Sequence, residues 1–447
     1  MELADRQFRH AVTLINPKMV QVAKEKHVDE LASMEFLGEI HAVRLEDPRC
    51  DSYEILEETA PELSEFAPVA EQDVSTVLFT SGSTGFPKGV MCTAFALDYI
   101  ARRVGESLHL TTSDTYYMPL SWCHVFGLSN GLYGPLVNGC RIVTGGRFNP
   151  ETAIELIQAE SCTVQLGVPT MFLRQLKVAK RTGQPIPLRC GITGGSGRNP
   201  ELIQDYEEYC GAKILPSYGM TEMTGGISAT DIDAPACCRY DSDGAPLPGV
   251  EFIITDSYTE DFGMLASDPA QRDAMPAALP ANVRGQICLK SIGVMGGYYC
   301  GGAFVSNPEL KSQWFPTGDI GFMDERNYVH VTGRLKDIII RGGLNIDPQE
   351  VESEYIRLAG VMEACLVGYP DDELGERSCL FVTPTQEEGR VTLDTNGLRA
   401  YAYSRVEKHK VPDKVVVIDE MPRLKASSKI DKRALEKMAS DLLEATR

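Results

Sequence analysis

Residues 80–89 carry side chains that could bind a polyphosphate, in the order Thr-Ser-Gly-Ser-Thr-Gly-Phe-Pro-Lys-Gly. The glycines allow the backbone to turn sharply and to approach a ligand closely. Exposed N–H groups and hydroxyls in such a loop form a concave site for an anion, to which Lys88 adds a mobile positive charge. The apolar run 74–79 directly before the loop predicts a buried strand that leads into it.

This loop differs from the Walker A motif, in which a Gly-Lys pair is followed by Ser or Thr. Here Lys88 stands three residues after Gly85 and is followed by Gly89. The alternative interpretation is a flexible linker, because Ser/Gly/Thr runs are often linkers. A strand directly before the run and the Pro-Lys-Gly sequence at its end favour a phosphate-binding loop.

A second segment, Tyr218-Gly219-Met220-Thr221-Glu222, combines three further groups that a nucleotide could use. A tyrosine ring can stack on a purine, and a threonine hydroxyl can bond to a phosphate oxygen. A glutamate can hold Mg²⁺ together with phosphate oxygens. On its own the segment is also compatible with an ordinary loop.

Three later segments could complete a nucleotide site. In the segment 314–319, Asp319 is suited to accept both ribose hydroxyls, and the alternative is a turn capped by this aspartate. Residues 333–337, Gly-Arg-Leu-Lys-Asp, precede paired glycines in 341–346 and fit a hinge. The alternative there is a hairpin with a solvated face. The lysines of 425–432, taken alone, are interpreted as solvated charges.

Together and in this order, the five segments resemble the ATP-dependent adenylate-forming superfamily: acyl- and aryl-CoA ligases, luciferases and the adenylation domains of peptide synthetases. The resemblance extends from about Val74 to Leu435. It also covers residues 194–197, Gly-Gly-Ser-Gly, on the adenine-contacting loop. Residues 119–128 look like the family's Pro-Leu-x-His-x-x-Gly segment.

The resemblance implies a role for each matching position. Lys429 falls on the catalytic lysine of the small domain and Lys336 on the hinge. Thr221 and Glu222 would act in catalysis, with Glu222 holding Mg²⁺. The implied acyl pocket consists of His124, Phe126 and Gly195. The implied nucleotide-binding residues are Thr80, Ser81, Gly82, Ser83, Thr84, Gly85, Lys88, Gly195, Ser196, Gly197, Tyr218, Gly219, Met220, Thr221, Asp319 and Arg334.

The resemblance further implies an acid–thiol ligase that uses ATP, Mg²⁺ and CoA in two half-reactions. A carboxylate forms acyl-AMP and pyrophosphate, and a thiol then displaces AMP. Segment 122–127 lacks the aspartate of amino-acid-activating members, so we expect an apolar acyl or aryl acid.

Two alternatives to a CoA ligase stay open. The thiol could belong to the phosphopantetheine of an acyl carrier protein, although Gly-Gly-x-Asn-Ile at 342–346 favours CoA. The chain could also be a non-catalytic relative that binds a nucleotide or acyl group. The joint presence of five charged residues argues against this second alternative: Lys88, Glu222, Asp319, Arg334 and Lys429.

The sequence departs from the family pattern at three places. Only 79 residues precede Thr80 where the family has a much longer segment, so we expect part of the first subdomain to be absent. Ser428 stands where a glycine usually precedes the catalytic lysine, and the spacing from Pro422 is one residue longer. Lys425 is therefore a competitor of Lys429. Ala94 replaces a common histidine, a change that we expect to be tolerated.

The pattern of elements predicts an α/β protein of two domains. A chain of 447 residues is long for one core. From Val74 to about Asp256, short apolar strands alternate with helical patterns, such as the helix expected at 150–160. With the resemblance, we expect a large AMP-binding domain of layered α/β subdomains at 1–335. A small mobile α+β domain at 336–447 would follow, joined to it by a hinge.

Further elements are expected on local grounds. Residues 256–284 have little pattern and predict a surface insertion. In the smaller domain, Asp347-Pro348-Gln349-Glu350 predicts a helix start with a capping glutamate, and Gly360 is expected to end that helix. Strands are expected at 141–144, 163–166, 286–290, 364–367, 379–382 and 415–418.

Composition excludes several classes of protein. The net charge is −20 and no basic block occurs, so a nucleic-acid partner is not expected. The 13 cysteines lack a C-x₂-C pattern and are interpreted as reduced thiols of a cytoplasmic protein. Neither a signal peptide nor an apolar run of 18 residues is found, so no membrane span is expected. The oligomeric state is left open.

Overall fold

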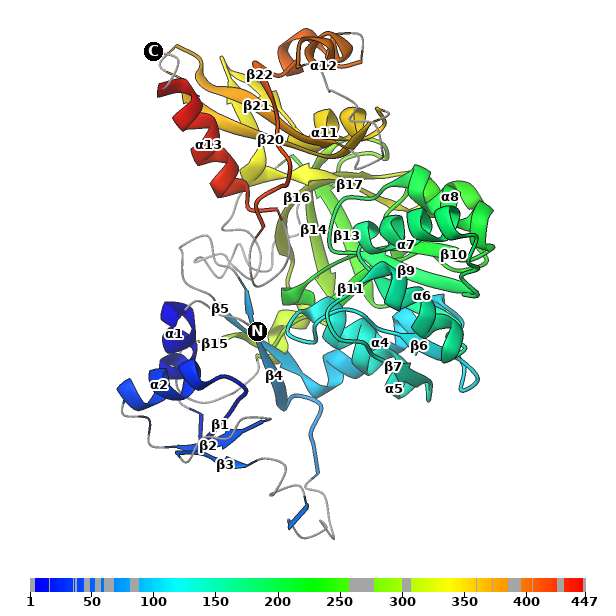
Figure 1. Ribbon diagram of the computed structural model, residues 1–447, viewed down its shortest axis with the longest axis vertical. Helices are drawn as coiled ribbons and strands as arrows, with labels where there is room; N and C mark the ends of the chain where they lie inside the picture. The colour runs from blue at the N-terminus through cyan, green and yellow to red at the C-terminus, as the bar shows by residue number, and fades with distance from the viewer. Residues whose placement is uncertain are drawn as a thin grey trace.

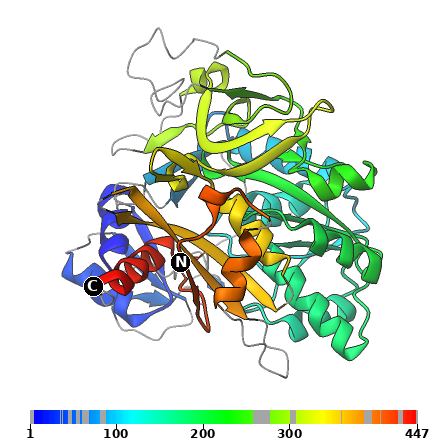
Figure 2. The same cartoon turned by 90° about the horizontal axis from the view of Figure 1, so that it is seen from above.

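The computed structural model contains a large N-terminal part and a smaller C-terminal part (Figure 1). Figure 2, viewed from above, shows the C-terminal part in front of the large part. The described residues are 5–15, 17–34, 36, 38–43, 49–52, 58–59, 68–80, 88–256, 277–299, 307–358, 360–371, 373–384, 395–403, 405–423 and 430–444.

The large part is built around a seven-stranded sheet with the strand order β12-β11-β10-β9-β8-β6-β7. The strands from β6 to β10 run parallel, and β11 and β12 are antiparallel additions at one edge. The central strands β8 and β9 are fully buried, as parallel strands covered by helices on both faces are. The strands are β6 (Thr115–Tyr117), β7 (Arg141–Val143), β8 (Val164–Gly167), β9 (Cys190–Gly194), β10 (Lys213–Met220), β11 (Gly225–Ala229) and β12 (Ala245–Pro246).

Helices cover both faces of this sheet, because neighbouring residues of a strand point to opposite sides. Tyr116 packs in a core with α4 and η1, whereas Tyr117 packs in a second core with α6, α7 and α8. This layering confirms the expected α/β class. The helices are α4 (Ala94–Ser107), the π-helix η1 (Phe126–Tyr133), α5 (Gly134–Val137), α6 (Pro150–Ala159), α7 (Pro169–Thr182), α8 (Pro200–Cys210) and α9 (Ala236–Asp241).

A four-stranded antiparallel sheet follows in the chain, with the order β13-β14-β16-β17. It comprises β13 (Val250–Thr255), β14 (Gly285–Ser291), β16 (Phe315–Met323) and β17 (Val329–Arg334). Of the expected surface insertion at 256–284, residues 257–276 lie outside the described residues. Residues 277–284 contain no helix or strand.

A three-stranded sheet, β15-β5-β4, holds the ends of the predicted phosphate loop. It comprises β4 (Val74–Thr80), β5 (Lys88–Thr93) and β15 (Gly297–Tyr299). Thr80 and Lys88 lie opposite each other in the antiparallel pair β4–β5. The strand before the loop is confirmed, but the expectation that it is buried is wrong. Only Leu78 of β4 is buried, because β4 lies at the edge of its sheet.

The N-terminal residues form a small layer of their own. It contains the parallel strands β1 (Met19–Val22), β2 (Glu39–Ala42) and β3 (Asp51–Ser52). Two helices, α1 (Asp5–Ile15) and α2 (Glu25–Ser33), accompany these strands.

The C-terminal part is a mixed sheet with helices on both faces. Its core on one face contains residues of α11 and α12, and its core on the other face contains Leu435 and Ala439 of α13. The expected strands at 364–367 and 379–382 are confirmed within β20 and β21, and the strand expected at 415–418 is β22, which begins and ends one residue earlier. The elements are β18 (Ile339–Arg341), β19 (Leu344–Ile346), α11 (Pro348–Ile356), β20 (Val361–Asp371), β21 (Gly375–Pro384), α12 (Thr395–Ala402), β22 (Lys414–Val417) and α13 (Lys432–Glu444).

The predicted start of α11 is confirmed, but its details differ. Asp347 is the N-cap, and its carboxylate accepts from the backbone N–H of Gln349 at 2.9 Å. Glu350 does not close a capping box: its carboxylate accepts from Lys410 Nζ at 2.9 Å instead. The helix ends at Ile356, four residues before Gly360, so the predicted end is wrong.

Two features of the described part of the chain bear on its composition. All twelve cysteines found there are free thiols. None of the described helices has the length and apolar character that crossing a bilayer requires.

Candidate active site

Two predicted segments meet at one edge of the large sheet. Strands β9 and β10 are parallel neighbours, with Gly194 opposite Ser217, so both chains leave the sheet at the same edge. Residues Gly195, Ser196 and Gly197 follow β9 in the loop before α8, and Gly219 and Met220 end β10. Ligands of open α/β sheets bind at this carboxyl-terminal edge.

Gly195 shows why the loop after β9 needs glycine. Its φ is +79°, a left-handed conformation that side chains rarely adopt. A Cβ at this position would meet only Val168, at 4.0 Å, so the space beside the backbone is open. The loop can therefore accept a flat ligand against its backbone.

Tyr218, Asp319 and Arg334 form one hydrogen-bonded group. The Tyr218 hydroxyl donates to Asp319 Oδ2 at 2.6 Å, and Arg334 Nε lies 3.1 Å from Asp319 Oδ1. Asp319 and Arg334 are direct partners in the pair β16–β17. Asp319 lies inside a strand, so its interpretation as an Asx-capped turn is wrong. The group presents a carboxylate and a guanidinium at the end of β10.

Burial is the largest influence on the pKa values of Asp319 and Tyr218. Burial raises the pKa of Asp319 above its ordinary value, although Arg334 and Tyr218 act in the opposite direction. Burial and the neighbouring Asp319 carboxylate raise the pKa of Tyr218, so the phenol stays protonated and donates its hydrogen bond. A carboxylate that is oriented in this way can accept hydrogen bonds from two hydroxyls of a ligand.

Glu222 and Lys88 both lie close to the side chain of Tyr298. Thr221 and Glu222 begin the short 3₁₀ helix η2 (Thr221–Met223) directly after β10. The Tyr298 hydroxyl donates to Glu222 Oε1 at 3.0 Å, and Lys88 Nζ lies 5.0 Å from the centroid of the Tyr298 ring. The structure therefore brings one carboxylate and one ammonium group beside the end of the predicted phosphate loop.

Sequence reasoning missed Tyr298. Burial and the Glu222 carboxylate raise its pKa, so it is a donor at neutral pH. Its signal in the sequence is weak, because it is one of two adjacent tyrosines. Pairing of β15 with β5, in which Tyr298 lies opposite Val90, sets the position of this side chain.

The Glu222 carboxylate fits a Mg²⁺ site of the kind found with nucleotides. Mg²⁺ in such sites takes one or two carboxylates and completes its shell with phosphate oxygens and water. One oxygen of Glu222 is occupied by Tyr298, and Lys88 is placed to neutralise phosphate charge in the same region. The donor set is therefore suited to a metal–polyphosphate pair.

Phe126 lies beside the start of the glycine loop, and His124 precedes it by two residues. A Cβ at Gly194 would lie 3.4 Å from the Phe126 ring, which places this ring against the end of β9. His124 is half-buried, and its carbonyl accepts from the backbone N–H of Leu128 at 2.9 Å. Phe126 begins the π-helix η1, a rare element that often marks functional sites.

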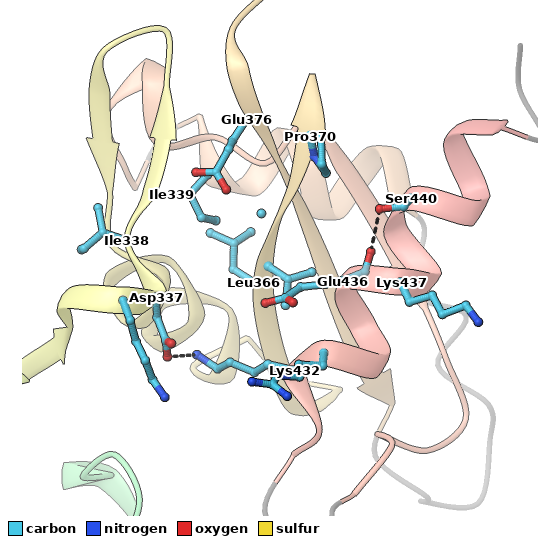
Figure 3. A pocket seen from close by; sticks show the side chains of 14 residues that line it. Asp337, Ile338, Ile339, Leu366, Pro370, Glu376, Lys432, Glu436, Lys437 and Ser440 are labelled. Carbon is cyan, nitrogen blue, oxygen red and sulfur yellow. Dashed lines mark hydrogen bonds and ion pairs between the residues drawn. The ribbon is translucent and has the colours of Figure 1, made fainter. Parts of the chain in front are cut away.

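Lys336 lies in the short helix η5 (Leu335–Asp337), between β17 and the hairpin β18–β19. The paired glycines Gly342 and Gly343 turn this hairpin with φ of +58° and +79°. Lys336 and Asp337 also line a cavity of about 400 Å³ in the C-terminal part. Figure 3 shows Lys432 reaching across to Asp337, with an Nζ–Oδ2 distance of 2.8 Å. The predicted hinge segment is thus anchored to the C-terminal part by an ion pair.

Several predicted site residues lie outside the described residues. They are Ser81, Gly82, Ser83, Thr84, Gly85, Lys425 and Lys429. Their roles stay predictions, whereas the positions of Thr80 and Lys88 at the two ends of the loop are described.

Comparison with known proteins gives the family. The family models described as AMP-binding enzyme and AMP-binding enzyme C-terminal domain match residues 1–299 and 350–429. The putative acyl-CoA synthetase YngI of Bacillus subtilis is 32% identical over 397 residues, 88% of this chain and 69% of that protein. The medium-chain fatty-acid–CoA ligase of Escherichia coli is 31% identical over 372 residues, 82% of this chain and 61% of that protein. The chain therefore spans 69% and 61% of the length of these two relatives.

Solved structures agree with the sequence comparison. ATP-bound MatB of Rhodopseudomonas palustris superposes with a TM-score of 0.82 at 25% identity, covering 99% of this chain and 83% of that chain. The apo form of MatB covers the same shares at 25% identity, with a TM-score of 0.69. The expected fold is thus confirmed. This chain belongs to the AMP-binding enzyme family, the adenylate-forming superfamily that its five sequence segments indicated.

Proposed function

We propose that this chain activates a carboxylic acid with ATP and transfers the acyl group to the thiol of CoA. The observation that carries the proposal is the pairing of two groups at one edge of the sheet. The first group is Tyr218, Asp319 and Arg334, and the second is Glu222, Tyr298 and Lys88. The first is suited to a ribose and the second to a metal-bound triphosphate.

In the first half-reaction, a carboxylate oxygen attacks the α-phosphorus of ATP, and the bond to pyrophosphate breaks. Both reactants are anions, so the step needs charge neutralisation and in-line positioning. Asp319 and Arg334 would hold the ribose, and Thr221 and Lys88 the phosphate oxygens. Lys429 would bridge the attacking carboxylate and the α-phosphate. When bound at Glu222, Mg²⁺ would supply further charge neutralisation.

In the second half-reaction, the thiol sulfur attacks the acyl carbon, loses its proton, and the bond to AMP breaks. This step needs a different set of groups around the acyl-AMP, which a rotation at Lys336 would supply. We place the boundary between the two domains at this residue, giving domains 1–335 and 336–447. The ion pair between Asp337 and Lys432 would carry the hinge segment with the smaller domain.

We propose an acid with an apolar acyl or aryl group. Phe126 lies against the end of β9, beside the open space at Gly195, and offers an aromatic wall. The name of the Escherichia coli relative, a medium-chain fatty-acid–CoA ligase, supports an apolar acid. Transfer to the phosphopantetheine of an acyl carrier protein is the second candidate, because both acceptors present the same thiol.

The test is ATP–pyrophosphate exchange by the purified protein with Mg²⁺ and a panel of acids. The panel contains short, medium and long alkyl acids, benzoate-like acids and amino acids. We expect exchange with alkyl or aryl acids and a thioester product when CoA is added. If a thioester forms with an acyl carrier protein but not with CoA, the carrier protein takes the place of CoA as the acceptor in the proposal. A folded protein that binds ATP without exchange on any acid would contradict the proposal.

A further inference from the structure

The ion pair between Arg284 and Asp347 joins the large part to the C-terminal part next to the nucleotide site. Arg284, directly before β14, donates through Nη2 to Asp347 Oδ2. Its Nε donates to Thr332 Oγ1 of β17 at 2.8 Å. Asp347 is the N-cap of α11, and its side chain is only 1% exposed. The arginine therefore fixes one end of α11 to the strand that carries Arg334.

The partner carboxylate lies directly against this strand. A Cβ at Gly333 would lie 2.6 Å from both carboxylate oxygens of Asp347. Only a glycine allows this approach, and Gly333 immediately precedes Arg334 of the nucleotide site. Movement of Asp347 away from β17 would thus open a space beside Arg334, which contacts Asp319.

Two further contacts join α11 to the loop and helix that follow β9. A Cβ at Gly197 would lie 2.7 Å from Gln349 Nε2, so the first turn of α11 lies on the glycine loop. Arg357 Nε, just after α11, lies 3.7 Å from Glu201 Oε1 of α8. Helix α11 therefore contacts both the ribose side and the adenine side of the predicted site.

The structure as a whole, with its two parts in this arrangement, superposes better on the ATP-bound form of one relative than on the apo form. With equal coverage, the TM-score to MatB is 0.82 for the ATP-bound structure and 0.69 for the apo structure. The contacts of Arg284, Gln349 and Arg357 belong to this arrangement.

We propose that Arg284 and Asp347 are positioning residues that hold the C-terminal part in the arrangement used for adenylation. The ion pair exists only while α11 lies on β17, so it lowers the free energy of this arrangement relative to any other. Without the arginine, this arrangement would bury the Asp347 carboxylate against β17 without the Arg284 charge, which is costly. The proposal rests on the proposed function, because it assigns the pair to one of the two half-reactions.

The test compares the half-reactions in Arg284→Gln and Asp347→Asn. Asparagine keeps the N-cap hydrogen bond of α11 and removes the charge, so the helix start is preserved. We expect ATP–pyrophosphate exchange to fall about tenfold, within the 5–150-fold range of typical coupling between sites. Thioester formation from supplied acyl-AMP and CoA should be unchanged or faster. Arg284→Lys should retain part of the exchange rate, because lysine keeps the charge but not the two-point contact.

Arg326→Gln is the matched control. Arg326 pairs with Asp324 at 3.1 Å in the turn between β16 and β17, within the large part. Its loss should alter neither half-reaction. An equal fall of both half-reactions in the Arg284→Gln protein, or no change in either, would overturn the proposal.

A second measurement is independent of catalysis. Gly197→Cys together with Gln349→Cys places two thiols where the glycine loop meets α11, and their disulfide is detected by mass spectrometry of the linked peptides. With ATP present, we expect the linked fraction to fall at least fivefold when Arg284→Gln is added. An unchanged fraction would overturn the positioning role. This result can be read even if no acid supports exchange, which separates it from failure of the proposed function.

Discussion

Tyr218 and Asp319 join two sheets of the large part through one hydrogen bond of 2.6 Å. Tyr218 belongs to the parallel sheet and Asp319 to the antiparallel sheet that follows it. The phenol favours the charged form of a carboxylate whose pKa is raised by burial. The bond therefore controls both the orientation and the ionisation of the proposed ribose acceptor.

Tyr218→Phe should weaken nucleotide binding and shift its pH dependence. Loss of a hydrogen bond to a charged group costs about 1.5–3 kcal/mol, so we expect the Kd for ATP to rise roughly tenfold or more at pH 7.5. Asp319 must be ionised to accept two hydroxyls, and its pKa is already raised. Without the phenol the pKa rises further, so weakening on acidification should begin at a higher pH than in the wild type.

Equilibrium binding of a fluorescent ATP analogue between pH 5 and pH 8 measures both effects. Tyr209→Phe is the control, because its hydroxyl donates to the carbonyl of Ala179, on α7. Superimposable pH curves for the Tyr218→Phe protein and the wild type would show that the phenol does not influence Asp319.

Glu222→Gln should cost more activity than Tyr298→Phe. The glutamate is the proposed Mg²⁺ ligand, and loss of such a charge-stabilising contact costs on the order of 2.7–4 kcal/mol, or 10²–10³-fold in ATP–pyrophosphate exchange. The tyrosine only orients the carboxylate, and loss of its hydrogen bond should cost about 1.5–3 kcal/mol.

Exchange rates measured over a range of Mg²⁺ concentrations compare the two variants. Glu222→Gln should require more Mg²⁺ for half-maximal exchange. If the Glu222→Gln protein exchanges within threefold of the wild type at every Mg²⁺ concentration, Glu222 is not the metal ligand.

Lys429→Ala should block adenylation and spare the thiol step. The lysine would bridge the carboxylate and the α-phosphate only in the first half-reaction, so pyrophosphate exchange should fall by about 10²-fold or more. Thioester formation from supplied acyl-AMP should stay near the wild-type rate. Lys425→Ala is the matched comparison, and a larger loss of exchange in that variant would transfer the catalytic role to Lys425.

Asp114 and Arg189 stabilise the large sheet away from the site. Arg189 donates to both oxygens of Asp114 at 2.8 Å, and Thr163 Oγ1 donates to Oδ1 at 2.7 Å. Burial alone would raise the pKa of Asp114, but these hydrogen bonds and that from the Thr111 N–H lower it to about 2. Asp114→Asn should therefore reduce the free energy of unfolding at pH 7 by about 2–3 kcal/mol.

The sign of the pH dependence follows from the lowered pKa. The unfolded aspartate titrates near 3.9, so this stabilisation is complete above about pH 4 and is lost as the pH falls toward 2. Urea unfolding of wild type and Asp114→Asn should show a difference that narrows across this range. Asp98→Asn, which removes an exposed pair with Arg102, should change stability by less than about 1 kcal/mol. A stability difference that stays constant between pH 4 and pH 2 would contradict the assignment.

The family, the α/β class and the starts of several helices follow from the sequence alone. These features depend on residue type and short-range spacing: Asn149 before Pro150 and Asp347 before Pro348 both cap their helices as such residues do. The order of the five segments is likewise a property of the chain alone. It indicated Tyr218, Glu222, Asp319 and Arg334 as members of one site.

How those members meet depends on the tertiary structure. Tyr218 and Asp319 are 101 positions apart, and Arg284 and Asp347 are 63 positions apart. Such contacts follow from which strands pair and in which register. Pairing of β15 with β5 brings Tyr298 beside Glu222, and pairing of β16 with β17 places Asp319 in a strand rather than a turn. Strand pairing is a competition between distant segments for the same hydrogen bonds and core space, so local residue preferences cannot resolve it.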